Sequence, residues 1–168
     1  MSVRRASRED AEVVGEIHSK AWKSAYRGLF PDEYIDSDTA SKRTEEFLES
    51  IKDDKCMYFL LEASGQPAGI VKTCECDNSL EIESIYILSE YRGQGLGAEA
   101  IDRICTYKPC DSIFLWVLED NIKARRFYEK NGFTMSGDTR TISRGVGLKQ
   151  LRYVFKAVNG GKEYGDAH

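Results

Sequence analysis

Apolar side chains recur at helical spacing in the first third of the chain. Ser7 can cap a helix whose first turn carries acidic residues, and the apolar positions that follow form a single stripe, three and four residues apart. The stripe consists of Val13, Val14, Ile17, Ala21, Trp22 and Ala25. Gly28 and Pro31 end this helix, because neither residue favours a helical interior. A short strand at residues 3–6 is expected before it, and a second helix over residues 39–51.

The apolar pattern then changes to the period of a strand. Strands are predicted over residues 57–61, 68–74 and 80–88, with turns at residues 64–67 and 77–79. Short turns join antiparallel neighbours, so the three strands are expected to form a meander. The last of them leads directly into the loop Tyr-Arg-Gly-Gln-Gly-Leu-Gly at residues 91–97.

A helix is predicted to begin within this loop, with Leu96, Ala100, Ile101 and Ile104 as its apolar side. A strand over residues 112–118, a helix over residues 122–130 and late strands near residues 133–135 and 148–156 complete the order. Helices, an antiparallel meander and a βαβα unit together predict a mixed α/β sheet. We expect one domain over residues 1–158 and a flexible tail over residues 159–168, which is rich in glycine and charge.

The composition is that of a globular protein and bears on its location and partners. Hydrophobic residues make up 41% of the chain and charged residues 31%, the balance of an ordinary globular protein. Membrane association is not expected, since no apolar run is long enough for a span. The N-terminus lacks the apolar segment of a secretory signal, so we expect a cytoplasmic location. The net charge of -4 argues against a nucleic-acid partner, because such partners favour a clustered basic face.

Cysteine and histidine content bears on metal and redox chemistry. All five cysteines are predicted to be free thiols, because cytoplasmic thiols stay reduced. They are Cys56, Cys74, Cys76, Cys105 and Cys110. Only two histidines are present, and no pair of cysteine knuckles accompanies them, so no metal site is expected.

The glycine-rich loop is the strongest chemical signal. A strand that ends in such a turn before a helix directs unpaired backbone N–H groups and the positive end of the helix dipole at one point, which favours phosphate. The loop fits the dinucleotide pattern G-x-G-x-x-G/A through Gly93, Gly95 and Ala98, and it also fits R/Q-x-x-G-x-G/A. A dinucleotide-binding domain places this loop after its first strand, whereas here several strands and two helices precede it. A glycine-rich turn without a ligand is the third interpretation.

Three linked blocks resemble the GNAT superfamily of N-acetyltransferases. Residues 80–88, Leu-Glu-Ile-Glu-Ser-Ile-Tyr-Ile-Leu, resemble its fourth strand, and residues 91–97 resemble its pyrophosphate loop. Residues 114–133 resemble its fifth strand and the following helix, with the pattern N-x-x-A-x-x-F-Y-x-K-x-G-F. The resemblance implies a mixed, mostly antiparallel central sheet flanked by helices, with the fourth and fifth strands splayed apart. It also implies acetyl-coenzyme A as co-substrate.

The same resemblance implies which residues hold acetyl-coenzyme A. Backbone groups of Ile85, Tyr86 and Ile87 would bind the pantetheine arm between the splayed strands, and one N–H would polarise the thioester carbonyl. Asn121 would contact the cofactor from the other strand, and it is also suited to cap the helix that follows. The loop and the first helical turn would hold the diphosphate through Arg92, Gly93, Gln94, Gly95, Gly97 and Ala98.

Two side chains are candidates for proton transfer. Tyr128 matches the family tyrosine that protonates the departing thiolate, and a phenol remains protonated at neutral pH. Glu83 is the candidate base, and Glu81 falls on the same face of the strand by simple alternation. A bulge would change that parity. Two alternatives stay open. A chain of water molecules could take the proton instead of a side chain, and Glu83 could be a strand acid that only faces solvent.

The acceptor is less well defined by the sequence. Trp22, Tyr26 and Glu81 are candidate residues of an acceptor pocket, although the helical spacing of Trp22 and Tyr26 fits core packing equally well. Residues 79–87 resemble the same strand of bacterial polyamine acetyltransferases of the PaiA type, so a small cationic amine such as a polyamine is the expected acceptor. A peptide or protein amine acetyltransferase, or a non-catalytic acyl-coenzyme A-binding module, is the alternative. Many family members pair through their late strands, so a homodimer is also open.

Overall fold

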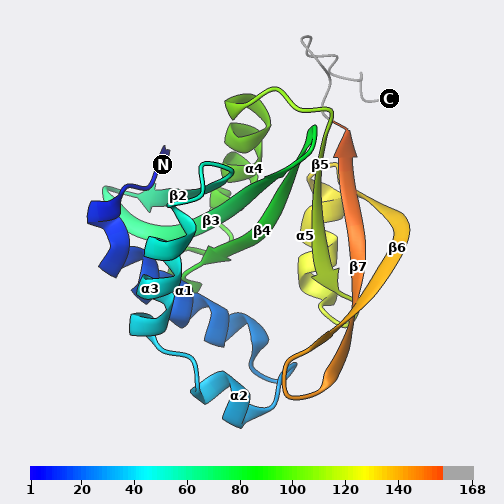
Figure 1. The fold of residues 1–168 in the computed structure, drawn as a ribbon, viewed down its shortest axis with the longest axis horizontal. Coiled ribbons are helices and arrows are strands. Elements are labelled where there is room, and N and C mark those ends of the chain that lie inside the picture. The colour runs from blue at the N-terminus through cyan, green and yellow to red at the C-terminus, as the bar shows by residue number, and fades with distance from the viewer. Residues whose placement is uncertain (157–168) are drawn as a thin grey trace.

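A seven-stranded sheet forms the centre of the molecule, and helices cover both of its faces (Figure 1). The computed structural model describes residues 1–156. Strand order is β1-β2-β3-β4-β5-β7-β6, and β4 and β5 are parallel while the other neighbours are antiparallel. The strands are β1 (Ser2–Arg5), β2 (Cys56–Ala63), β3 (Gln66–Cys76), β4 (Ser79–Ile87), β5 (Ser112–Leu118), β6 (Thr134–Ser143) and β7 (Gly147–Lys156). The predicted mixed, mostly antiparallel sheet is confirmed.

One face of the sheet is covered by α1 (Ala11–Tyr26) and α3 (Ala40–Ser50). Val14, Ile17, Ala21 and Trp22 of the predicted α1 stripe are buried, while Val13 and Ala25 are half-buried. Phe47 is the buried residue of α3, and Thr39 caps this helix by accepting a hydrogen bond from the Lys42 N–H at 3.2 Å. The two helices approach closely at Gly15, where a Cβ atom would lie 2.7 Å from the carbonyl oxygen of Ala40. Because real Cβ atoms do not approach a carbonyl so closely, glycine is required at this crossing.

The other face is covered by α4 (Leu96–Tyr107) and α5 (Ile122–Lys130), which pack on the larger core. The predicted apolar side of α4 is buried, since Leu96, Ala100, Ile101 and Ile104 are each at most 4% exposed. Phe133, directly after α5, is also buried in this core. The two helices therefore stand on the face opposite α1 and α3, and β4 and β5 lie between the two layers (Figure 1).

The central strands β4 and β5 separate soon after they meet. Their parallel pairing covers only Ser79 to Glu81 on β4 and Ser112 to Phe114 on β5. Beyond these residues, β4 stays paired with β3 and β5 stays paired with β7, so the sheet opens into a wedge (Figure 1). The splay expected between the fourth and fifth strands is confirmed.

Some elements differ from those predicted. The short helix α2 (Asp32–Asp36) was not expected, and β6 continues to Ser143, well beyond the strand predicted near residues 133–135. The longer β6 forms a hairpin with β7 whose tip approaches the segment after α1: a Cβ atom on Gly145 would lie 3.2 Å from Cγ of Pro31. The tail expected over residues 159–168 lies outside the described residues.

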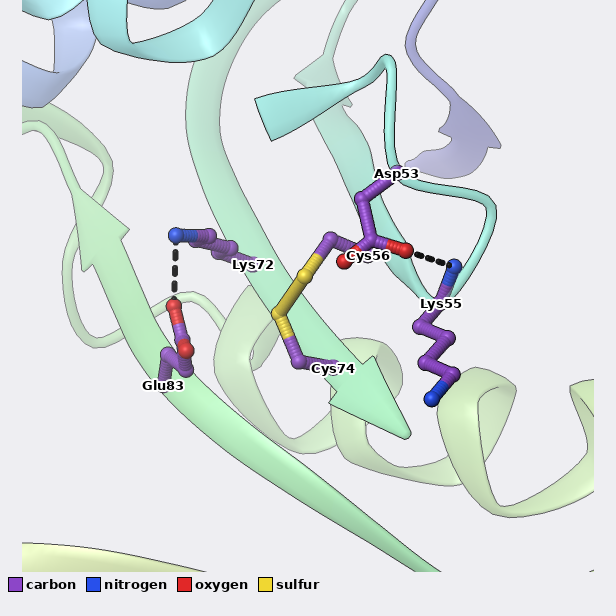
Figure 2. Close-up of a disulfide and its surroundings, with 6 residues drawn as sticks. All are labelled: Asp53, Lys55, Cys56, Lys72, Cys74 and Glu83. Atoms are coloured by element: carbon purple, nitrogen blue, oxygen red, sulfur yellow. Dashed lines mark hydrogen bonds and ion pairs between the residues drawn. A yellow bond between two sulfur atoms is a disulfide. The ribbon is translucent and has the colours of Figure 1, made fainter. Parts of the chain in front are cut away.

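The prediction that all five cysteines are free is wrong for two of them. Cys56 and Cys74 form a disulfide between β2 and β3, with their Cα atoms 4.2 Å apart (Figure 2). They face each other because β3 contains one extra residue: the register shifts between the pairs Leu61↔Gly69 and Glu62↔Pro67. The prediction of free thiols rested on the cellular compartment alone and took no account of the strand register. Cys76, Cys105 and Cys110 are free thiols.

None of the helices within residues 1–156 is long and apolar enough to cross a membrane.

The disulfide is expected to stabilise the fold measurably. It links residues 18 apart in sequence, and closing a loop of that size contributes about 3 kcal/mol to the free energy of unfolding. For a domain of this length, this corresponds to roughly 6–12 °C in the unfolding midpoint. A thiol reductant should lower the midpoint of the wild-type protein by that amount and leave the double variant Cys56→Ala/Cys74→Ala unchanged. An equal response of both proteins would contradict a stabilising disulfide.

Candidate active site

The glycine-rich loop forms a cradle that is open to solvent. Gly93 and Gly95 have φ angles of 77° and 85°, in the left-handed region that glycine adopts without strain. A Cβ atom at either position would meet no atom within 4 Å, so the space above the loop is free. Gly97 has a different role, because a Cβ atom there would lie 2.7 Å from Cζ of Phe127. The first two glycines shape the cradle, and the third lets α5 pack against α4.

Helix α4 begins at this cradle with its first-turn N–H groups directed into it. Gly95 occupies the N-cap position, and within the described residues no side chain caps the helix. The N–H groups of the first turn and the helix dipole are therefore available to an anion. Arg92 anchors the loop instead of extending over it: its Nε donates to the Ile87 carbonyl at 2.9 Å and its Nη1 donates to Ser24 Oγ at 3.3 Å. Gln94 turns back to the Glu90 carbonyl.

A cavity of about 590 Å³, which we call the splay cleft, lies at the end of β4 that has separated from β5. Its walls come from β4, the glycine-rich loop, the start of α4 and α5. Nearly all of the residues predicted to hold the cofactor line it, with Gln94 outside. They are Ile85, Tyr86, Ile87, Arg92, Gly93, Gly95, Gly97, Ala98 and Asn121. The side chain of Asn121 accepts a hydrogen bond from the Ala124 N–H at 3.1 Å, which confirms its role as the cap of α5.

Tyr128 lies on α5 and lines the splay cleft. Its ring packs against Phe127 and Phe133, with centroids 5.2 and 5.8 Å away. Burial raises the pKa of the Tyr128 hydroxyl, and the nearby Tyr26 raises it further. The phenol is therefore neutral over the whole physiological pH range and can donate a proton into the cleft.

The two acids of β4 line the same cavity, although the strand contains a bulge at Glu83. The pairing with β3 shifts between Lys72↔Ser84 and Thr73↔Ile82, so Glu83 is an extra residue without an opposite partner on β3. Glu81 and Glu83 both line a second cavity, away from the splay cleft. Glu83 forms an ion pair with Lys72 at 2.6 Å (Figure 2). Burial raises the pKa of the Glu81 carboxyl, and the charge of Glu83 adds to this shift.

The second cavity, which we call the charged cavity, has a volume of about 300 Å³. Trp22 and Tyr26 contribute to its wall, and they also pack in a small core with Phe30. The core packing that their spacing predicts is confirmed, and their part in an acceptor pocket stays a prediction. Tyr86 lines the charged cavity and the splay cleft, so it stands where the two spaces approach each other.

His18 supports Tyr86 from the side of α1. The two rings stack with centroids 5.0 Å apart. Burial lowers the pKa of His18 to about 4, and the Arg43 charge contributes to the shift. Its Nδ1 atom is buried and has no hydrogen-bond partner in the described part of the chain. Since the imidazole is neutral above that pH, His18 adds no charge behind the site.

Four basic residues of these cavities were not identified from the sequence. Lys123 and Lys130 on α5 line the splay cleft, where they can face phosphate groups. Arg140 on β6 and Arg144 in the turn after β6 line the charged cavity. The first pair stands seven residues apart, which is a helical repeat. Arg140, Ile142 and Arg144 follow one another at intervals of two residues, which places the side chains of an extended segment on one face, and the shorter predicted strand did not include them.

These features fit the cofactor implied by the resemblance to N-acetyltransferases. The cradle has free space above its glycines, an uncapped helix start and basic side chains nearby, which suits a diphosphate. The edge of β4 that faces the wedge lacks a strand partner after Glu81, so its backbone can bond an extended chain.

Comparisons with known proteins agree with this geometry. The model of the acetyltransferase (GNAT) family matches residues 19–133. A probable N-acetyltransferase of Mycobacterium tuberculosis is 26% identical over 90% of this chain and 91% of its own length. A spermidine N(1)-acetyltransferase of Thermoplasma acidophilum is 27% identical over 79% of this chain and 88% of its own. The crystal structure of the PaiA N-acetyltransferase of Thermoplasma acidophilum with coenzyme A has a TM-score of 0.74 at 23% identity, covering 92% of this chain and 98% of that one.

Proposed function

Because the chain belongs to the GNAT acetyltransferase family, and is therefore an acetyl-CoA-dependent acetyltransferase, we propose that it acetylates a small primary amine by direct attack in a ternary complex. The observation that carries this proposal is the splay cleft. A phosphate-binding loop, an unpaired strand edge and a neutral tyrosine converge in it. Such an arrangement can hold an acyl thioester and supply a proton to its sulfur.

The splay cleft would position acetyl-CoA through three groups of contacts. Backbone N–H groups of the loop and of the first turn of α4 would bind the diphosphate, assisted by Lys123 and Lys130. The open edge of β4 at Ile85, Tyr86 and Ile87 would bond the pantetheine arm, and one of its N–H groups would polarise the thioester carbonyl. Asn121, whose Oδ1 caps α5, keeps its amide nitrogen for the cofactor.

Two side chains would transfer the protons of the reaction. The acceptor nitrogen forms a bond to the acetyl carbon while the carbon–sulfur bond breaks. Glu83 would take the proton that the nitrogen loses, and Tyr128 would give one to the departing thiolate. The burial of Tyr128 supports this direction of transfer, because the phenol is protonated before the reaction.

The acceptor would enter from the charged cavity, where Glu81 and Glu83 can hold its ammonium group. A small cationic amine such as a polyamine is the acceptor supported by the resemblance of residues 79–87 and by the spermidine acetyltransferase among the relatives. The volume of about 300 Å³ suits a small molecule better than a folded protein surface.

Two measurements test the proposed function. Acetyl-CoA and coenzyme A should each raise the unfolding midpoint, since a ligand that binds only the folded state stabilises it, whereas NAD(P) should not. Thiol release from acetyl-CoA should then depend on the presence of an amine, tested over a panel of polyamines, amino acids and peptides. Stabilisation by acetyl-CoA without acetylation of any amine would indicate a binding module and contradict the proposal.

Replacement of the proposed acid should slow the chemical step. Tyr128→Phe keeps the ring and its packing but removes the donor, so kcat should fall by a factor of roughly 10²–10⁴. The matched control is Tyr107→Phe on α4, which removes a hydroxyl outside both cavities. Steady-state kinetics with a saturating acceptor provide the measurement, and a kcat equal to that of the wild type would exclude Tyr128 as the acid.

The two acids can be separated by their pH profiles. A carboxylate base is active only when ionised, so kcat/KM should fall as the pH drops through its pKa. Glu83→Gln should remove this acidic limb, and Glu81→Gln should retain it while raising KM for the amine. If only Glu81→Gln removes the limb, Glu81 is the base, a role compatible with its raised pKa. If the acidic limb of the pH profile is unchanged in both variants, neither acid is the base, and a chain of water molecules takes the proton.

A further inference from the structure

Side chains of both charges line the charged cavity. Glu81 and Glu83 line it from β4, Arg140 lines it from β6, and Arg144 lines it from the turn after β6. The formal charges of the four side chains balance. Glu83 is in addition neutralised by Lys72, which lies just outside the cavity wall. The cavity is therefore lined by both charges and not by acids alone.

These charges do not satisfy one another inside the protein. None of the ion pairs among the described residues joins Arg140 or Arg144 to a carboxylate, and Glu81 has no ionic partner either. The acids and Arg140 nevertheless interact across the cavity. Burial lowers the pKa of Arg140, and the charges of Glu81 and Glu83 oppose that shift. Buried charges are normally paired, so charges that lack a direct partner in the protein are available to a ligand that enters the cavity.

Arg140 is held in a fixed position for such a ligand. Its guanidinium carbon lies 4.4 Å from the centre of the Trp116 ring, and its Nε donates to Gln150 Oε1 at 2.7 Å. Stacking and one hydrogen bond orient the planar group. Its two terminal nitrogens bond no residue in the described range 1–156, so they can bond a carboxylate in the bidentate geometry that arginine favours. Arg144 donates only to the neighbouring Ser143 carbonyl among the described residues.

We propose that the acceptor amine of this enzyme also carries a carboxylate, with its ammonium group held by Glu81 and Glu83 and its carboxylate by Arg140 and Arg144. This inference rests on the proposed function and narrows its acceptor class to small amino acids and related amino-carboxylates. The apolar wall formed by Trp116, Leu118 and Ile142 suits an apolar part of the acceptor between or beside the charged ends. A polyamine would place a cation against the two arginines, so it is the competing acceptor.

Matched amine pairs test the inference. Both members of each pair carry a primary amine, and only one member also carries a carboxylate. Leucine is compared with leucinamide, and γ-aminobutyrate with putrescine, at fixed acetyl-CoA. Charge-assisted bonds to two arginines should give at least one carboxylate member a kcat/KM roughly ten- to a hundred-fold above that of its partner. Equal or higher values for leucinamide and putrescine would overturn the inference while leaving the proposed function intact.

Charge-removing variants locate the preference in the cavity. Arg140→Gln and Arg144→Gln should each raise KM for the preferred carboxylate acceptor at least ten-fold and change KM for its uncharged or cationic partner little. Arg152→Gln is the control: Arg152 lies on β7, pairs with Asp138 and is not part of the cavity wall. Unfolding midpoints verify that the variants fold. A preference that persists in both cavity variants would overturn the inference.

A binding measurement separates this inference from the proposed function. In the presence of coenzyme A, leucine should raise the unfolding midpoint more than leucinamide, with no turnover required. If no amine is acetylated but this difference is found and is lost in Arg140→Gln, the proposed function fails and the recognition of amino-carboxylates stands. If all matched pairs bind and react alike, the inference fails whatever the activity.

Discussion

The early separation of β4 from β5 is the constraint on which the rest of the structure depends. Two half-sheets, each fully paired internally, are joined at only three residue pairs. The separation leaves backbone N–H and C=O groups without a strand partner in the middle of the fold, an arrangement that proteins otherwise avoid. The glycine-rich loop, the uncapped start of α4 and the α5 residue Tyr128 all border the opened space. In the proposed function, the unpaired backbone would serve as a binding surface, and a ligand with an extended, polar arm would complete the hydrogen bonds of the sheet.

Prediction from the sequence succeeded where a signal is local. The bounds of β5 and α5 were predicted correctly, because a continuous apolar run marks the strand and Asn121 marks the start of the helix. The loop was identified as a phosphate site only together with the blocks before and after it. All predicted cofactor residues except Gln94 line the splay cleft, since the position of each follows from the strand–loop–helix order.

Prediction failed where one residue of register decides the outcome. The extra residues at Ala68 on β3 and at Glu83 on β4 each turn the following side chains to the opposite face. The first brings Cys56 opposite Cys74, which was not predicted. The second turns the residues after Glu83, whereas Glu81 and Glu83 line the same cavity, as the simple alternation predicted. The late strand β6 was predicted too short because Gly137 and Asp138 resemble a turn, whereas they form an irregularity within the strand. Arg140 and Arg144 were therefore not assigned to any site.

In the proposed mechanism, Tyr86 stands between the group that would take a proton and the group that would give one. Tyr86 borders both cavities and meets Tyr26 edge to face, with ring centroids 6.4 Å apart. Burial raises the pKa of Tyr26, Tyr86 and Tyr128, so all three phenols are neutral where the cavities approach. The anionic groups stand on the acceptor side, and Tyr128 stands on the cofactor side. With the proposed acid and base on different sides, neither side chain neutralises the other before the amine arrives. A transfer by direct attack needs this separation, because the nitrogen loses its proton and the sulfur gains one in a single ternary complex.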